Sequence, residues 1–260
     1  MSCPDCFRGG KAVGDPKGTI QTIYGTPTYV AEPPSTSASR STIIIYTDGF
    51  GLGIVNSKVL ADAYASLTGM RVLVPDIIPG GPMPHTVMDT MDTIMEPVAL
   101  LNIIGQIKKG HRSVKADLPA GGKLGLAGFC WGGFLSINLS TKAAVEGGEE
   151  RLVDAAFAAH PSSLSLPDNI VDAVKFKTPL AIAHAEKDVA LSTLKMEETE
   201  AVLKQRVGDG HGEGEHNYQI KIYKGVGHGF AVRAKPGSEI EAKSADEAKE
   251  QAAEWFKRWL

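Results

Sequence analysis

Short apolar runs alternate with longer amphipathic stretches along most of the chain, which is the pattern of a sheet covered by helices. Several of the short runs are almost wholly apolar, as expected for central strands that are buried on both faces. The first two runs are nearly adjacent and predict an antiparallel hairpin. The runs that predict strands are residues 19–25, 27–32, 42–48, 71–76, 123–128, 154–160, 179–185 and 218–223.

Helical periodicity fills the intervals between these runs. At the C-terminal end, Ala248, Ala252, Trp255, Phe256 and Trp259 fall on one stripe and predict a terminal helix that docks on the core. Strand–helix alternation predicts a mainly parallel sheet with helices on both faces, the α/β class. We expect one domain over residues 1–260, with 1–18 as an irregular N-terminal segment. The other predicted helices cover residues 58–68, 88–109, 131–145 and 193–206.

Composition removes several classes of function. The 260 residues are 43% hydrophobic and 22% charged, and the net charge of -3 does not favour a nucleic-acid partner. No apolar run reaches the roughly 20 residues that cross a bilayer, and the N-terminus lacks the apolar centre of a secretory signal. Three cysteines, with Cys3 and Cys6 ahead of the first strand, form no disulfide framework. A cytoplasmic protein is expected.

The stretch KLGLAGFCWGGFL, residues 123–135, places a lone thiol among four glycines. A strand runs directly into Gly128-Phe129-Cys130-Trp131-Gly132, and a helix follows. This order matches the G-x-S-x-G nucleophile elbow, with sulfur in place of oxygen. The helix N-terminus would favour the thiolate of Cys130. The alternative is a buried structural cysteine with glycines nearby by chance.

Two further strand ends carry chemistry-bearing side chains. Asp188 follows the next-to-last strand, where an acid could orient an imidazole or could cap the next helix. His228 follows the last strand between two glycines, in a loop where a lone histidine is usually solvated. Carboxyl ends of parallel strands meet at one edge of a sheet, and the order Cys130, Asp188, His228 is the nucleophile–acid–base order of α/β-hydrolases. We therefore predict a catalytic triad.

These residues resemble the dienelactone hydrolase family, the α/β-hydrolases with a cysteine nucleophile. The N-terminal SCPDCFRGG with TPTYVAEP is similar to the eukaryotic, particularly fungal, branch of that family. GFCWGG and GHGF are similar to the two signatures of that family. The resemblance implies an α/β-hydrolase fold and ester or lactone hydrolysis. It also implies that Asp48, where better-known members have glutamate, contacts the thiol, and that Arg233 holds a substrate carboxylate. The second arginine of the family has no counterpart in PDIIPGGPMPH, which argues against small diacid substrates.

The mechanism predicts further site residues. A tetrahedral oxyanion would be bound by the backbone N–H groups of Trp131 and Gly49. Phe50, His160 and Phe230 lie near strand ends and are candidates for the walls of the substrate pocket, although packing roles would also explain them.

No phosphate-binding or zinc-binding motif occurs, so no cofactor and no metal are expected. The expected partner is a small ester or lactone, with no nucleic acid and no membrane, and the protein would be a monomer or weak homodimer. Two other functions fit the same scaffold: a non-hydrolytic binding module with a vestigial triad, and an isomerase or lyase acting on a biosynthetic intermediate.

Overall fold

A computed structural model describes residues 9–34, 39–78, 107, 109–210 and 217–260. Its eight-stranded sheet has the order β1-β2-β4-β3-β5-β6-β7-β8. The six strands β4-β3-β5-β6-β7-β8 are parallel to one another. The strands β1 and β2 form an antiparallel hairpin, and β2 pairs antiparallel with β4. The predicted mostly parallel α/β fold with an N-terminal hairpin is confirmed. The strands are Thr19–Ile23, Thr26–Ala31, Thr42–Tyr46, Arg71–Pro75, Leu124–Phe129, Ala155–Ala159, Leu180–Lys187 and Tyr218–Gly227.

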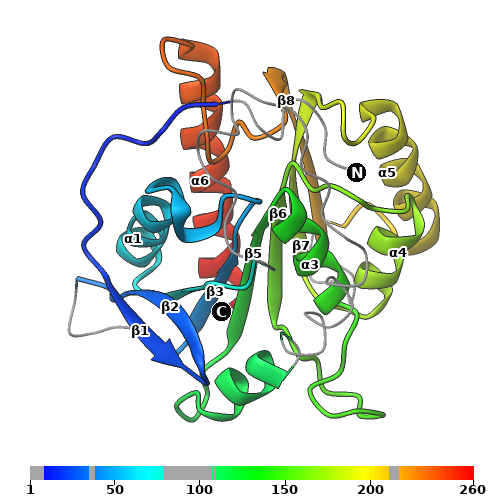
Figure 1. Ribbon diagram of the computed structural model, residues 1–260. Coiled ribbons are helices and arrows are strands. Elements are labelled where there is room, and N and C mark those ends of the chain that lie inside the picture. The colour runs from blue at the N-terminus through cyan, green and yellow to red at the C-terminus, as the bar shows by residue number, and fades with distance from the viewer. Residues whose placement is uncertain (1–8, 35–38, 79–106, 108, 211–216) are drawn as a thin grey trace.

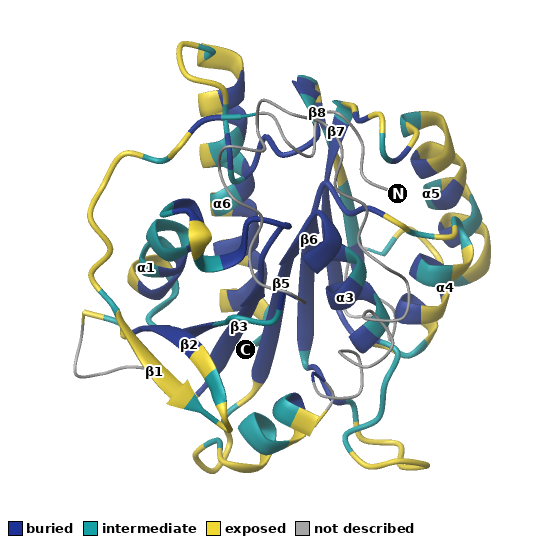
Figure 2. Ribbon diagram, viewed as in Figure 1, coloured by how far each residue is buried: buried dark blue, intermediate teal, exposed yellow. Residues whose placement is uncertain are grey.

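Helices cover both faces of the sheet (Figure 1). On one face lie α1 (Asn56–Thr68) and α6 (Glu239–Trp259), and on the other lie α3 (Trp131–Leu139), α4 (Asp168–Lys175) and α5 (Thr193–Val207). Each face has its own apolar cluster, because successive side chains of a strand point to opposite faces. Figure 2 shows the central strands β3, β5 and β6 buried along their lengths.

The helices of the structure agree with the predicted ones where hydrophobic periodicity is strong. They differ from the prediction in three places. The helix expected over 131–145 ends at Leu139, because Ser140 Oγ and Thr141 Oγ1 donate to carbonyls of its last turn. The helix α4 was not predicted, since it spans only two turns. Of the helix expected over 88–109, residues 88–106 and 108 lie outside the described residues.

In the part of the chain that the structure describes, no helix is long and apolar enough to cross a membrane.

Candidate active site

Cys130 sits on a strained turn between β5 and α3. Its backbone has φ 56° and ψ −117°, and it is the N-cap residue of α3. A non-glycine residue in such a conformation costs on the order of 1–3 kcal/mol, so the surrounding structure must hold it there. Cys130 is the only free cysteine among the described residues, and it is 7% exposed. The predicted elbow conformation is thus present.

Two glycines of the elbow are required by close backbone approach. A Cβ on Gly128 would overlap the carbonyl of Gly132, and a Cβ on Gly132 would overlap the carbonyls of Tyr46 and Thr47. The start of α3 therefore presses against the end of β3. This contact brings the loop that follows β3 beside the thiol, as the G-x-C-x-G spacing predicts.

Asp188 and His228 are brought together by the adjacent ends of β7 and β8. His228 Nδ1 lies 2.9 Å from Asp188 Oδ2 and 3.0 Å from Oδ1, and both side chains are fully buried. Asp188 Oδ1 also accepts from the backbone N–H of Ala190 at 2.8 Å, which fixes the carboxylate. Assigned from this network, the proton of a neutral His228 sits on Nδ1 and Nε2 carries the lone pair of a base.

The thiol has a different hydrogen-bond partner from the one expected. Cys130 Sγ lies 3.8 Å from Ser162 Oγ, and the backbone N–H of Ser162 donates to the carbonyl of Cys130. Among the described residues no hydrogen bond joins the thiol to His228 or to Asp48. Sequence reasoning missed Ser162, because nothing in HPSS indicates which serine faces the elbow.

Asp48 and Arg233 pair with each other. A guanidinium N–H of Arg233 donates to Asp48 Oδ2, and both side chains are at most 1% exposed. Asp48 Oδ1 accepts from the backbone N–H of Phe50, and the guanidinium lies 5.0 Å from the Phe50 ring centroid. Because Asp48 and Arg233 form an ion pair, Asp48 does not make the expected contact with the thiol. For the same reason, Arg233 does not offer the expected open site for a substrate carboxylate.

The aromatic residues expected to line the substrate pocket are enclosed. Phe50 and His160 are 0% exposed and Phe230 is 1% exposed, so they pack beneath the site and do not face an open surface. The His160 ring lies 4.9 Å from the His228 ring in an edge-to-face arrangement. Burial, and then the neighbouring His228, hold the pKa of His160 well below its usual range. His160 therefore stays uncharged beside His228.

The two N–H groups expected to bind an oxyanion have no acceptor in the described part of the chain. The N–H groups of Phe50 and Gly51 both donate to Asp48, whereas those of Gly49 and Trp131 make no hydrogen bond with any described residue. Gly49 is buried and Trp131 is 6% exposed. Unused backbone donors beside a nucleophile are the elements of an oxyanion hole.

The N-terminal segment supports the loop that carries Arg233. Asn56, the first residue of α1, donates through Nδ2 to the carbonyls of Gly10 and Val232 at 2.9 and 2.8 Å. Its Oδ1 accepts from the N–H of Ala12 at 3.0 Å. This clamp was not predicted, because it joins segments far apart in the sequence.

No group of three or more His, Cys, Asp or Glu residues that could hold a metal ion occurs among the described residues.

Comparison with known proteins identifies the family of the chain. The family model of the dienelactone hydrolase family matches residues 26–260. The hydrolase pyvD of Aspergillus violaceofuscus is 27% identical over 98% of this chain and 96% of its own. Dienlactone hydrolase 1 of Gibberella moniliformis is 27% identical over 98% and 93%. The fold is shared with a dienelactone hydrolase candidate from Klebsiella pneumoniae, at a TM-score of 0.64 and 19% identity over 93% and 98%. The chain belongs to the dienelactone hydrolase family, as its motifs predict, and this family membership makes it a carboxylic ester hydrolase.

Proposed function

We propose that the protein hydrolyses an ester or lactone through a thioester on Cys130, with His228 as the base and Asp188 as the residue that orients it. The observation that carries the proposal is the buried His228–Asp188 pair, at 2.9 Å, at the same sheet edge as a cysteine held at φ 56°. A structural cysteine needs neither feature, whereas the nucleophile of an α/β-hydrolase elbow has a strained turn and an adjacent base.

The reaction begins when the Cys130 side chain turns from Ser162 toward His228. Hydrogen bonds of catalytic groups are often long or absent in an unliganded site and form only with substrate. The thiol proton passes to His228 Nε2, and the sulfur forms a bond to the carbonyl carbon. The carbonyl electrons move onto oxygen, and the N–H groups of Gly49 and Trp131 bind the oxyanion.

The intermediate then collapses. The C–O bond of the ester breaks, and His228 gives its proton to the departing oxygen, which leaves the acyl group on Cys130. A water molecule loses a proton to His228 Nε2 and attacks the thioester. The C–S bond breaks, the acid departs, and the proton on His228 returns to the sulfur. Asp188 stabilises the imidazolium in both halves of the cycle.

The Asp48–Arg233 pair bears on the class of substrate. Arg233 is 1% exposed and its guanidinium is already bonded to a carboxylate. A substrate carboxylate would have to displace Asp48 and leave that acid buried without its counter-charge. We propose an uncharged ester or lactone in preference to a diacid.

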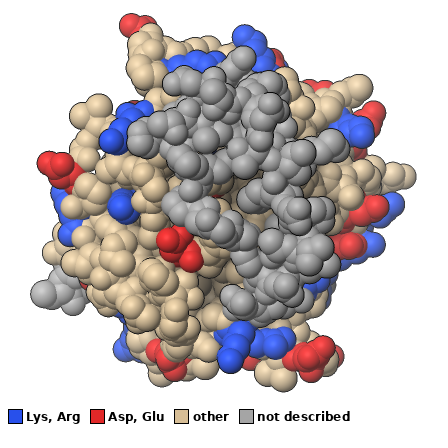
Figure 3. Space-filling view, viewed as in Figure 1, with Lys and Arg blue, Asp and Glu red and all other residues tan. Residues whose placement is uncertain are grey.

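The remaining expectations are part of this proposal. Basic and acidic side chains are mixed around the rim of the face in Figure 3, as suits a small-molecule enzyme without a nucleic-acid partner. We propose a cytoplasmic location and a monomer or weak homodimer.

Turnover of p-nitrophenyl acetate, followed by mass spectrometry of the trapped acyl-enzyme, tests the mechanism. The acyl group is expected on the peptide that contains Cys130, and Cys130→Ala is expected to abolish both turnover and acylation. The double variant Cys3→Ala/Cys6→Ala is the matched control, since it removes the other two thiols and should keep the activity. Turnover that persists in Cys130→Ala would refute the mechanism. A wild-type thiol that is inert to iodoacetamide, with no ester turned over, would favour a binding module.

A further inference from the structure

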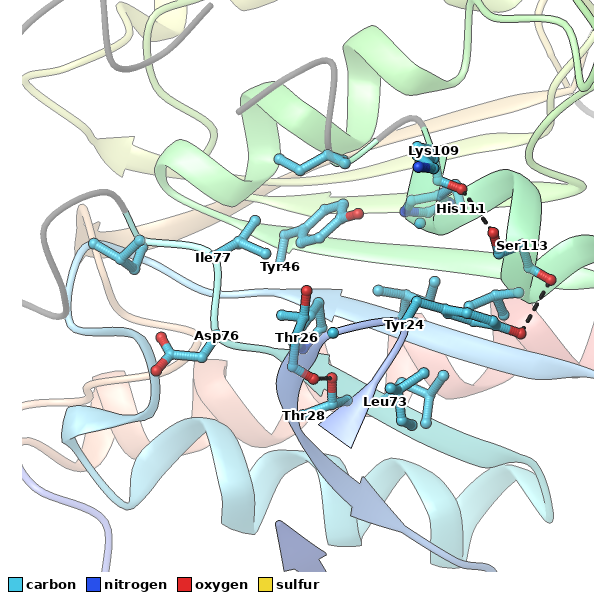
Figure 4. A pocket seen from close by; sticks show the side chains of 18 residues that line it. Tyr24, Thr26, Thr28, Tyr46, Leu73, Asp76, Ile77, Lys109, His111 and Ser113 are labelled. Atoms are coloured by element: carbon cyan, nitrogen blue, oxygen red, sulfur yellow. Dashed lines mark hydrogen bonds between the residues drawn. The ribbon is translucent and has the colours of Figure 1, made fainter. Parts of the chain in front are cut away.

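A cavity of about 700 Å³ lies away from the proposed catalytic groups. It is lined by the β1–β2 hairpin, by β3 and β4 with the residues after β4, and by Ile107 and residues 109–114 (Figure 4). Its lining includes none of Cys130, Asp188 and His228. Its volume lies within the roughly 300–1,000 Å³ of small-molecule sites. Nothing in the proposed reaction uses it.

The floor of the cavity is apolar. Ile44 and Leu73 belong to the apolar cluster on the α3 side of the sheet, and Ile78, Ile107 and Val114 close the sides. A wholly apolar cavity would accept any hydrocarbon of the right size and would stay dry without one. The selectivity of this cavity must therefore come from its polar side chains.

His111 is a polar side chain of the lining whose two ring nitrogens the described residues leave without a partner. It is 1% exposed, and neither Nδ1 nor Nε2 has a hydrogen-bond partner among the described residues. Its ring lies 5.4 Å from the Tyr46 ring, and Figure 4 shows the Tyr46 hydroxyl on the His111 side of the cavity. A buried polar group without a partner costs on the order of 1–3 kcal/mol, which a ligand hydroxyl would recover.

The charge state of this wall selects against anions. Burial lowers the pKa of His111 to about 3, so at neutral pH the ring has one N–H donor and one acceptor nitrogen and no charge. Lys109 is the only Lys or Arg among the described residues of the lining, and it is exposed. Asp76, with a buried Oδ1 that lacks a partner among the described residues, would repel an anion. A ligand without negative charge is therefore preferred.

We propose that this cavity is a second small-molecule site, which takes a mainly apolar compound that carries a hydroxyl group and no negative charge. The hydroxyl donates to or accepts from a ring nitrogen of His111, and the apolar part of the ligand lies on the Ile44–Leu73 floor. Tyr46 borders the ligand from β3.

The test uses 2-naphthol as the probe, with naphthalene as the analogue without a hydroxyl, and measures binding by fluorescence titration. We expect 2-naphthol to bind wild type and Cys130→Ala equally. In His111→Phe its affinity should fall about tenfold, the loss of one buried hydrogen bond, while naphthalene binds as before. Binding of 2-naphthol to wild type weaker than about 1 mM, or equal loss for both compounds in His111→Phe, would overturn the proposal.

A second pair of variants tests the location independently of His111. Val114→Trp fills the cavity and should weaken both probes about tenfold or more, whereas Leu194→Trp, on an exposed position of α5, should weaken neither. Circular dichroism verifies that each variant is folded. If Val114→Trp is folded and binds 2-naphthol like wild type, the probe lies elsewhere and the proposal fails. If 2-naphthalenesulfonate binds as tightly as 2-naphthol, the inferred preference for a ligand without negative charge is wrong.

Discussion

A buried histidine, His228, lies at the carboxyl edge of β5, β7 and β8, and another, His111, lies at the cavity beside β2, β3 and β4. The two differ in whether the surrounding protein supplies a hydrogen-bond partner. At the sheet edge, His228 donates to Asp188, and His160 packs against its ring. In the cavity, His111 makes no hydrogen bond with the described residues. His228 thus has an acid as its built-in partner, although His160 beside it has no described partner for either ring nitrogen. At His111 the unpartnered ring borders a cavity in which a partner could bind.

A buried imidazole can therefore have two functions, which depend on whether an acid lies beside it. An acid beside a buried imidazole favours its charged form, which is what a base needs when it accepts a proton during catalysis. Burial without an acid keeps an imidazole neutral, which suits recognition of a hydroxyl. The same residue type therefore predicts chemistry in one region and binding in the other.

The largest effect is expected from removing the acid of the first region. Asp188→Asn should lower kcat/KM for p-nitrophenyl acetate by about 10⁴-fold, because the amide no longer holds the required tautomer or stabilises the imidazolium. The matched control is Asp172→Asn on an exposed position of α4, which should change kcat/KM by less than about twofold. A loss below about tenfold in Asp188→Asn would remove Asp188 from the proposed triad.

The next largest effect concerns the second buried pair at the sheet edge. Asp48→Asn removes the carboxylate that pairs with the buried Arg233 guanidinium, and should lower the free energy of unfolding by about 3–5 kcal/mol in urea titrations. Glu247→Gln breaks the half-exposed Lys221–Glu247 pair and should cost only about 0–1 kcal/mol. If the Asp48 variant also loses less than about 1 kcal/mol, the pair is not a buried structural lock.

The double variant Asp48→Asn/Arg233→Met distinguishes the lost counter-charge from general damage. Since it removes both charges, it should regain most of the stability lost by Asp48→Asn alone.

Local sequence predicts the sheet edge well. Strand ends, the GFCWGG elbow and the order of Cys130, Asp188 and His228 depend on short-range pattern and on the rule that parallel strands end at one edge. The same local information does not say which side chains pair across that edge. Asp48 and Arg233 are 185 residues apart in sequence, so each was assigned a separate role and their pairing was missed.

The cavity could not be predicted for a related reason. Its walls come from the hairpin, two non-adjacent strands and the helical segment of His111, and a void has no periodicity of its own. His111 is one of seven histidines in the sequence, and no motif separates it from the others. Its unsatisfied nitrogens become visible only once the surroundings are packed.

The pH dependence of the free energy of unfolding tests whether His111 is neutral in the folded protein. The pKa of His111 is about 3 in the folded protein and about 6.5 when unfolded, so as the pH falls below about 6.5 the unfolded chain takes up a proton first and stability decreases. In His111→Phe this loss is absent. The slope of unfolding free energy between pH 6 and 4 should therefore be shallower by about 1.4 kcal/mol per pH unit.

Urea titrations at pH 6, 5 and 4 measure that slope. Ile107→Val is the control, because it alters the packing of the same cavity without removing a titratable group, and should shift stability equally at each pH. Parallel curves for wild type and His111→Phe would mean that His111 is protonated in the folded state, which contradicts its burial without a partner.

The smallest effect is expected at Ser162, the partner of the thiol. The Ser162 hydroxyl accepts from the Cys130 thiol at 3.8 Å, and it can turn to donate to the thiolate once the proton leaves. Ser162→Ala should therefore lower the rate of alkylation by iodoacetamide near pH 7 by less than about tenfold and move its pH midpoint upward. Ser136→Ala is the matched control: Ser136 is equally buried in α3 but donates to the carbonyls of Leu126 and Phe157, away from the thiol. That variant should lose stability and leave the midpoint of alkylation unchanged. If Ser162→Ala instead speeds alkylation, the hydroxyl favours the protonated thiol, and the inference that Ser162 donates to the thiolate is wrong.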